Sequence, residues 1–239
     1  MTTLKNLEII QAKQELYDAF NSFILSSDTK VFGKLLARCL LLDYVKNIPG
    51  DIVECGVFKG TGILTLLKAK KFLCPNSIKK VIGFDFYDTD GLLASLSGQD
   101  KEAMTTLFRD RGFNHKDSFV KYLSDLVLSC GFLEHEFDLV KGDVSNTTLE
   151  YSKNNPGLRI SLLYIDLDIA KPTYDTLSNL WDNVSTGGLV VFDEYAYHCW
   201  SESNGADDFF RSKNVQIKSL NFLAPTAYVV KGGGSFPRE

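Results

Sequence analysis

The chain has 239 residues, of which 44% are hydrophobic and 23% charged, and its formal net charge at pH 7 is −4. These values are typical of a globular protein with one large core. The acidic balance weighs against a nucleic-acid partner, because phosphate binding needs a basic face. The sequence has no apolar run of membrane-spanning length and no C-x-x-C pair among its five cysteines. We therefore expect a cytoplasmic protein with free thiols that contacts neither nucleic acid nor membrane.

Two helices are predicted before the first strand. Apolar residues recur at helical spacing over residues 4–25, and a second helical pattern covers residues 31–46. The polar break Ser26-Ser27-Asp28 offers an N-cap for the second helix, which Pro49-Gly50 ends. We expect residues 1–50 to form a helical segment that acts as a lid, as an oligomerisation surface, or as both.

An alternation of short β-rich runs and helical stretches begins at residue 51. It predicts an α/β fold with a mostly parallel sheet and helices on both faces. Two further β-rich runs, residues 215–220 and 226–230, are joined by a short connection and predict an antiparallel hairpin. The five strands expected to be parallel are residues 52–55, 80–85, 137–141, 161–166 and 189–193.

A long insertion separates the second and third predicted strands. Residues 86–136 contain polar and helix-like stretches, and so long a connection in a compact domain is usually functional. We expect it to form a cover over the binding pocket of a domain that spans residues 51–231. The glycine-rich end, residues 232–239, is predicted to be a flexible tail.

The turn after the first predicted strand has the layout of a nucleotide-binding site. Gly56 stands at the exit of the strand, where a side chain would block a ligand, and Gly60-Thr61 opens the next helix. The pattern is E-x-G-x-x-x-G and not the G-x-G-x-x-G of dinucleotide-binding folds. The charge of Glu54 repels a pyrophosphate but suits the ammonium group of a methionine moiety. The alternative is that Glu54 caps a helix or pairs with a nearby lysine.

Acidic residues also follow the next two predicted strands. Asp85 is placed to accept hydrogen bonds from ribose hydroxyls, and Asp143 from an adenine amino group. With Glu54 they predict a site for S-adenosylmethionine. A nicotinamide-dependent dehydrogenase that uses Asp85 for the ribose is the alternative, and the missing glycine pattern argues against it. The predicted cofactor-binding residues are Glu54, Gly56, Val57, Phe58, Gly60, Thr61, Asp85, Phe86, Asp143, Val144 and Asp166.

Four more carboxylates stand at the ends of the fourth and fifth predicted strands. Neighbouring parallel strands bring Asp166, Asp168, Asp193 and Glu194 to one edge of the sheet, where they repel one another unless a cation joins them. An oxygen-only cluster suits Mg²⁺ or a similar hard divalent ion, which lowers the pKa of a bound hydroxyl. We predict metal ligands at Asp166, Asp193 and Glu194.

The base that deprotonates the hydroxyl has three candidates. Asp166 and Asp168 lie in the predicted metal cluster, and His198 follows the Asp-Glu pair by four residues. Each has an ordinary alternative. Asp168 and Glu194 are also suited to be helix caps or surface acids, and a lone histidine in an aromatic-rich segment is more often packed or exposed.

These motifs together resemble the macrocin O-methyltransferase (TylF-like) family. The similarity lies in the run from Ile48 to Gly60, in Gly83-Phe84-Asp85, in the run from Tyr164 to Asp168, in Pro172-Thr173 and in the run from Gly187 to Tyr195, and it covers roughly residues 30–231. It implies a Rossmann-like class I methyltransferase fold with a seven-stranded sheet. It also implies methylation of a sugar hydroxyl with S-adenosylmethionine and magnesium, and assembly into homo-oligomers.

Two departures from the family pattern concern the acceptor. Glu194 stands where the family often has Asp, and the residues after Asp85 read Phe86-Tyr87-Asp88-Thr89-Asp90-Gly91 in place of Ser-Phe-Glu-Gly. The resemblance implies a sugar-bearing small-molecule acceptor, and because of the second departure a non-sugar acceptor is the alternative.

Overall fold

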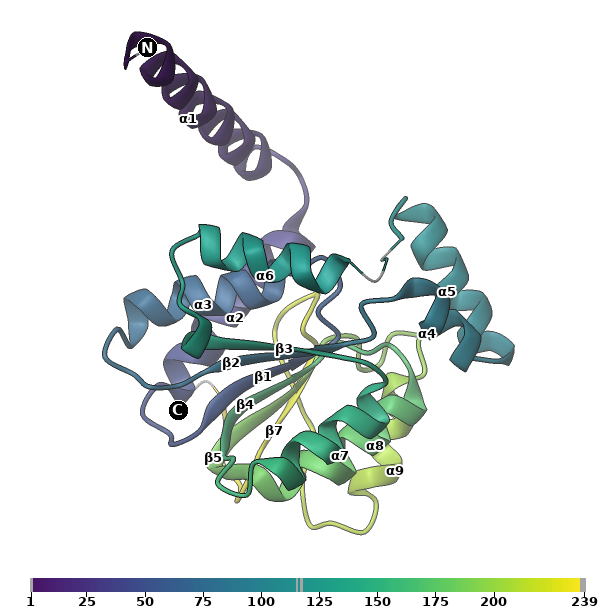
Figure 1. The fold of residues 1–239 in the computed structure, drawn as a ribbon. Helices are drawn as coiled ribbons and strands as arrows, with labels where there is room; N and C mark the ends of the chain where they lie inside the picture. Colours follow the sequence, from purple (N-terminus) through teal and green to yellow (C-terminus); the bar gives the residue numbers. More distant parts are fainter. Residues whose placement is uncertain (1, 115, 117, 237–239) are drawn as a thin grey trace.

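A computed structural model describes residues 2–114, 116 and 118–236 of the chain. Its centre is a seven-stranded sheet of order β3-β2-β1-β4-β5-β7-β6, in which only β7 and β6 run antiparallel to their neighbours (Figure 1). This confirms the predicted mostly parallel sheet with an antiparallel C-terminal edge. The strands are β1 (Asp51–Cys55), β2 (Val81–Asp85), β3 (Phe137–Lys141), β4 (Ile160–Ile165), β5 (Val184–Phe192), β6 (Lys218–Ser219) and β7 (Ala227–Val230).

Helices cover both faces of the sheet (Figure 1). Apolar side chains of α2, α3 and α6 pack on one face, and those of α7, α8 and α9 pack on the other. The two layers bury β4 and the second half of β5 on both sides, which explains why residues 162–165 and 189–192 are mostly apolar. The helices are α1 (Thr2–Ile24), α2 (Thr29–Val45), α3 (Thr61–Leu73), α4 (Thr89–Ser95), α5 (Gly98–Asp110), α6 (Phe119–Ser129), α7 (Val144–Asn154), α8 (Ala170–Leu180) and α9 (Glu202–Phe210), with 3₁₀ turns at Glu134–Glu136 and Trp181–Asn183.

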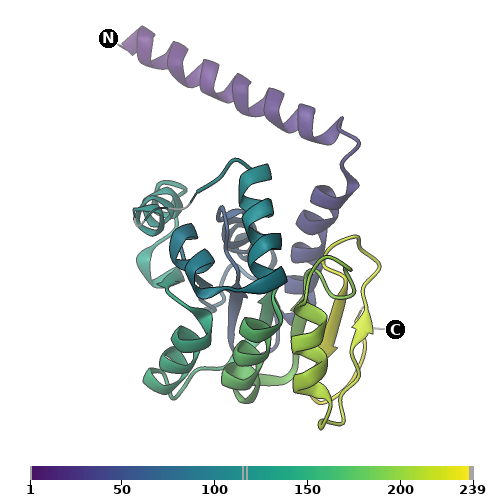
Figure 2. The same ribbon diagram turned by 90° about the vertical axis from the view of Figure 1, so that its right-hand side faces the viewer.

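The two N-terminal helices differ in their packing. Asp28 caps α2 by accepting a hydrogen bond from the Val31 backbone N–H at 2.9 Å, as the sequence predicts. The inner face of α2 is buried in the core, with Leu41 and Leu42 fully inaccessible. Helix α1 instead extends away from the body of the molecule (Figures 1 and 2). The part of the segment 1–50 that shares the core of the domain is therefore α2.

Strand β5 is longer than predicted. It begins at Val184, whereas the sequence places its start at residue 189. The pairing of β5 with β4 shifts register between Ile160 and Leu162, and Gly187 adopts a left-handed φ of 84° inside the strand. Gly187 and Gly188, which the predicted strand leaves out, therefore lie at an irregularity within the strand.

The insertion contains two kinds of structure. Helix α6 returns to the sheet and buries Leu123 and Val127 in the main core. Helices α4 and α5 lie apart from this core (Figure 1) and form a small apolar cluster centred on Met104, Phe108 and Ile169. Of the predicted tail, residues 232–236 are described and 237–239 lie outside the described residues. The Phe236 backbone exchanges two hydrogen bonds of 2.8 Å with the Tyr228 hydroxyl.

Candidate active site

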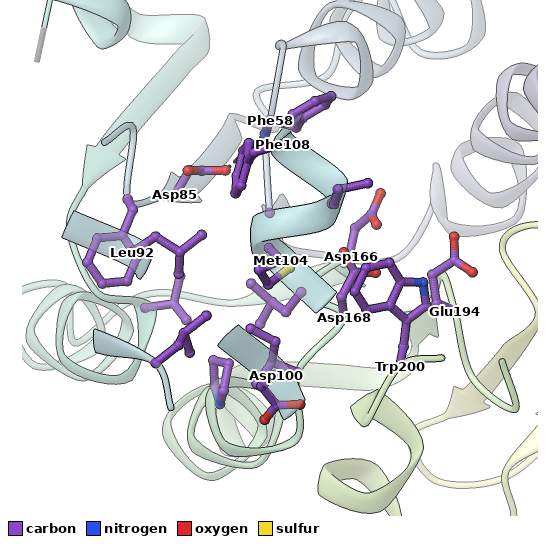
Figure 3. Close-up of a pocket in the computed structure, with 18 of the residues that line it drawn as sticks. Phe58, Asp85, Leu92, Asp100, Met104, Phe108, Asp166, Asp168, Glu194 and Trp200 are labelled. Carbon is purple, nitrogen blue, oxygen red and sulfur yellow. Dashed lines mark hydrogen bonds between the residues drawn. The ribbon is translucent and has the colours of Figure 1, made fainter. Parts of the chain in front are cut away.

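A cavity of about 620 Å³ lies at the carboxyl ends of the parallel strands. The strand ends form one wall, with Asp85, Asp166 and Glu194 among its polar residues (Figure 3). Helices α4 and α5 form the opposite wall, with Leu92, Met104 and Phe108 among its apolar residues. Ligands bind at this edge of open α/β sheets, so the cavity is the candidate active site.

Asp85 is held by the backbone around it. Its Oδ2 accepts hydrogen bonds from the backbone N–H groups of Val57 at 2.8 Å and Phe58 at 2.9 Å, and its Oδ1 accepts one from Tyr87 at 2.9 Å. These bonds tie the turn after β1 to the end of β2. The carboxylate lines the cavity in a fixed position, which suits the predicted contact with a ribose.

Gly56 and Gly60, in the turn after β1, allow neighbouring segments to pack closely against it. A Cβ at Gly56 would lie 1.8 Å from the Asp166 carbonyl oxygen, because the ends of β1 and β4 almost touch there. Gly56 was predicted to be a glycine so that a ligand can approach, and the neighbouring backbone also requires a glycine there. At Gly60 the backbone is left-handed, with φ 87°, and a Cβ would meet Leu123 of α6.

Glu54 is buried beneath the cavity and does not line it. Its side chain is 1% exposed, and its Oε1 accepts a hydrogen bond from the Arg38 guanidinium at 2.8 Å. Burial raises the pKa of the Glu54 carboxyl, while Arg38 opposes that shift. Oε2 has no hydrogen-bond partner, and Gly62 leaves room for it. The cation beside Glu54 is thus an arginine from α2, which the sequence analysis did not consider.

The predicted cofactor residues divide into two groups. Asp143 lines the cavity and also caps α7, accepting a hydrogen bond from the Ser145 backbone N–H at 2.9 Å. Thr61 is exposed at the start of α3 and does not line the cavity. The residues that line the cavity are Gly56, Phe58, Asp85, Phe86, Asp143, Val144 and Asp166, and those that do not are Glu54, Val57, Gly60 and Thr61.

The acids at the ends of β4 and β5 are paired with lysines of α2. The Lys34 ammonium lies 2.5 Å from Asp193 Oδ2 and 3.4 Å from Asp166 Oδ2, and the Lys30 ammonium lies 2.9 Å from Glu194 Oε1. Lys30, Lys34 and Arg38 are four residues apart, so they form one row on the helix. That spacing is visible in the sequence, but nothing there places α2 opposite these strand ends.

The predicted metal ligands do not form a metal centre as they stand. Among residues 2–114, 116 and 118–236, no three histidine, cysteine or acidic side chains are arranged to hold a metal ion. The donor set nevertheless fits a hard cation, since it is all oxygen and Glu194 Oε2 is buried without a hydrogen-bond partner. The ammonium of Lys34 lies where such a cation would contact Asp166 and Asp193.

Asp168 has the environment of a proton acceptor. It lines the cavity, and its backbone has a left-handed φ of 63°. Burial, together with the nearby charges of Glu194 and Asp193, raises the pKa of the Asp168 carboxyl to about 7. A carboxyl with that pKa exchanges its proton near neutral pH, which suits a general base. Burial and the charge of Asp193 also raise the pKa of Asp166 well above its ordinary value.

Two residues after β5 differ from the prediction for the site. Glu202 was not predicted to take part in it, and His198 was a candidate base. His198 is exposed and does not line the cavity, although Tyr197 and Trp200 on either side of it do. Glu202, at the start of α9, is fully buried. Its carboxylate accepts hydrogen bonds from the backbone N–H groups of Leu167 at 3.4 Å and Glu194 at 3.1 Å. It therefore joins the two loops that carry the acids.

The sheet order and the position of the cavity define a class I methyltransferase fold. The structure of a calicheamicin methyltransferase has a TM-score of 0.75 with this chain at 23% identity, covering 92% of this chain and 86% of that one. The structure of the O-methyltransferase NovP has a TM-score of 0.66 at 19% identity, covering 83% and 79%.

The sequence comparison defines the family more closely. The family model described as macrocin-O-methyltransferase (TylF) matches residues 34–223, so the chain belongs to this family. Demethyldecarbamoylnovobiocin O-methyltransferase of Streptomyces niveus is 26% identical over 159 residues, which cover 62% of this chain and 54% of that protein. A rhamnosyl-tetracenomycin C 4'-O-methyltransferase of Streptomyces olivaceus is 25% identical over 170 residues, covering 67% and 59%. The match spans little more than half the length of these relatives.

No described helix is long and apolar enough to cross a membrane.

Proposed function

We propose that this protein is an S-adenosylmethionine-dependent O-methyltransferase that methylates a hydroxyl of a sugar-bearing small molecule, assisted by Mg²⁺ or a similar hard divalent ion. The observation that carries this proposal is the cavity at the carboxyl edge of a methyltransferase sheet, where Asp85 lies at one end and the acid cluster of β4 and β5 at the other. Both curated relatives are named as O-methyltransferases, and one of their acceptors bears a rhamnosyl group.

The cofactor is proposed to lie along the ends of β1, β2 and β3. Asp85 accepts hydrogen bonds from the ribose hydroxyls, and Asp143 accepts one from the adenine amino group. Phe58 and Phe86, which line the cavity, supply aromatic surface for the adenine ring. The sulfonium then faces Asp166, where nearby carboxylates favour its positive charge.

The acceptor is proposed to lie between the acids and the α4–α5 wall. Trp200, Met104 and Phe108 present apolar surface to one face of the acceptor and exclude water from the reacting atoms. A sugar ring or an aromatic aglycone suits such a surface. The non-sugar acceptor stays the alternative, because the segment after Asp85 departs from the family pattern.

The transfer needs the acceptor hydroxyl to lose its proton. Asp168 takes the proton from the oxygen, that oxygen forms a bond to the methyl carbon, and the carbon–sulfur bond breaks to leave a neutral thioether. Asp166 is the alternative base. A divalent ion held by Asp166, Asp193 and Glu194 would lower the pKa of the hydroxyl. Tyr164 donates a hydrogen bond of 2.5 Å to Asp193 Oδ1 and fixes that carboxylate.

The test has two parts. Calorimetry with S-adenosylhomocysteine is expected to show binding, and the absence of heat at high micromolar protein would reject the cofactor assignment. A methyl-transfer assay across nucleotide-sugars and glycosylated natural products, with Mg²⁺ or with a chelator, is expected to find a sugar hydroxyl as acceptor. Turnover confined to non-sugar hydroxyls would reject the substrate class and leave the reaction type standing.

We also infer that two copies of the chain associate through their N-terminal helices. Both α1 and the first half of α2, together with the connection between them, carry exposed large apolar side chains, namely Leu16, Tyr17, Phe20, Ile24, Leu25, Val31, Phe32, Leu35 and Leu36. So many exposed apolar side chains on neighbouring segments are typical of an interface. Light scattering is expected to give a dimer or larger assembly for the full chain, and a smaller species when residues 1–25 are removed. A monomeric full chain would contradict this.

A further inference from the structure

We propose that Lys34 is the resident cation of the acid cluster, and that a divalent metal ion can bind there only by displacing the Lys34 ammonium from Asp193 and Asp166. This inference rests on the proposed function, because it takes Asp166, Asp193 and Glu194 as the metal ligands. It adds that Lys34, a residue of the chain itself, competes with the metal ion for those ligands.

The oxygen that both cations need is Asp193 Oδ2. The Asp193 side chain is 0% exposed, and its other oxygen already accepts the hydrogen bond from Tyr164. The Lys34 ammonium lies 2.5 Å from Oδ2. A divalent ion held by the same oxygen would stand next to the Lys34 ammonium, so the two cations compete for it. Their mutual repulsion in a mostly buried site excludes double occupancy as well.

Helix α2 holds Lys34 opposite the acids. Its residues Ala37, Leu41 and Leu42 are fully buried in the core, so the helix backbone does not leave this face of the sheet without unpacking it. The Lys34 side chain is 26% exposed and lines the cavity. Its long flexible stem can therefore carry the ammonium into the cavity when a metal ion arrives.

A resident cation is needed because the acids are buried and close together. Carboxylates gathered without a counter-charge repel one another and lose their hydration, which destabilises the folded chain. Arg38 pairs chiefly with Glu54, and Lys30 pairs with Glu194. Lys34 is the α2 cation that contacts both Asp166 and Asp193 within 3.5 Å among the described residues. It thus compensates two of the three predicted ligands, including the fully buried Asp193.

The test is a Mn²⁺ titration of the full-length chain followed by electron paramagnetic resonance, which counts free ion directly. Lys34→Met removes the competing charge and is expected to bind Mn²⁺ at least about tenfold more tightly than the wild type. Lys46→Met is the matched control. Lys46 directly follows the last residue of α2 and pairs with Asp43 at the exposed surface. Because it lies away from the acid cluster, its loss is expected to leave Mn²⁺ affinity unchanged.

A melting experiment gives a second readout. Without metal, Lys34→Met leaves buried carboxylates unpaired, so its melting temperature is expected to fall below that of the wild type. Added Mn²⁺ is expected to raise the melting temperature of the variant more than that of the wild type. If the methionine variant does not fold, Lys34→Gln is measured in the same two experiments. Equal or weaker Mn²⁺ binding after loss of Lys34 would overturn the proposal.

Cofactor binding separates this inference from the proposed function. Titration with S-adenosylhomocysteine in chelator needs no metal and reports on the other end of the cavity. If the cofactor product binds and neither the wild type nor Lys34→Met binds Mn²⁺, the competition is refuted together with the metal assignment, and the methyltransferase assignment survives. If Mn²⁺ binding tightens in Lys34→Met without cofactor binding, the competition is supported and the methyltransferase assignment fails.

Discussion

The two ends of the cavity are built from acids that are held in different ways. At the proposed cofactor end, Asp85 accepts hydrogen bonds from backbone N–H groups of its own turn and of the turn after β1, and Asp143 accepts one from its own turn. At the proposed acceptor end, Asp166, Asp193 and Glu194 are paired with lysine side chains from α2. The first end is therefore fixed by backbone hydrogen bonds within and between the strand-end turns. The second depends on a helix that precedes the sheet and on flexible side chains, so it is the end that can rearrange.

The largest expected effect tests the acceptor end. Replacing Asp168 with Asn removes the proposed base and is expected to lower kcat by roughly 10²–10⁴-fold. S-adenosylhomocysteine affinity is expected to stay within about threefold, because the Asp85 end is untouched. Steady-state methyl transfer and calorimetry check the two values. A normal kcat in Asp168→Asn with a collapsed one in Asp166→Asn would assign the base to Asp166.

The next effect tests the contact between α2 and the sheet. Arg38→Met leaves the Glu54 carboxylate buried without its cation and is expected to lower the free energy of unfolding by about 3–5 kcal/mol. Adding Glu54→Gln removes the unpaired charge and is expected to recover a large part of that loss. Denaturant unfolding of both variants measures the change. A loss below about 1 kcal/mol in Arg38→Met would mean that Glu54 takes up a proton or another partner at little cost.

A smaller effect is expected at the cofactor end. Asp85→Ala removes the proposed ribose acceptor and the carboxylate that receives the Val57 and Phe58 N–H groups. We expect S-adenosylhomocysteine affinity to fall by about ten- to a hundredfold. Asp90→Ala, at an exposed position nearby, serves as the control in the same calorimetry. If both variants bind equally well, Asp85 supports the turn but not the ribose.

The smallest effect separates two roles of Asp143. Asp143→Ala removes the N-cap of α7 and is expected to lower the free energy of unfolding by about 1 kcal/mol. Asp143→Ser keeps a capping oxygen and is expected to restore that stability, but its shorter hydroxyl does not reach an adenine amino group. Denaturant unfolding and calorimetry are compared for the pair. Full cofactor affinity in the serine variant would limit Asp143 to capping.

The sheet was the most predictable part of the fold. Strand β3 has the predicted bounds, and β1 differs by one residue, because both are short β-rich segments next to glycine-containing turns. The prediction for β5 fails at its start, where Gly187 and Gly188 lie inside the strand. Glycine signals both turns and strand irregularities, and the pairing with β4 decides between them only in three dimensions.

The site was predictable where an acidic residue stands at the end of a predicted strand. Asp85 and Asp143 follow their strands directly, and the structure places both in the cavity wall. The lysine pairs join residues 132 and 164 positions apart, and no periodicity in the sequence reports such distances. The same limit explains His198, which is near the acids in sequence and outside the cavity lining in space.

Glu202 has a consequence for redesign. One buried carboxylate accepts hydrogen bonds from both acid-bearing loops, and the pairing of β4 with β5 sets their separation, so neither constraint comes from the α4–α5 wall. The wall and the acids meet mainly through the cluster around Met104 and a hydrogen bond of 2.9 Å from the Ser201 hydroxyl to Asp100. The α4–α5 segment is thus a replaceable module. Exchanging it for that of a relative is a route to new acceptors that leaves the reacting groups in register.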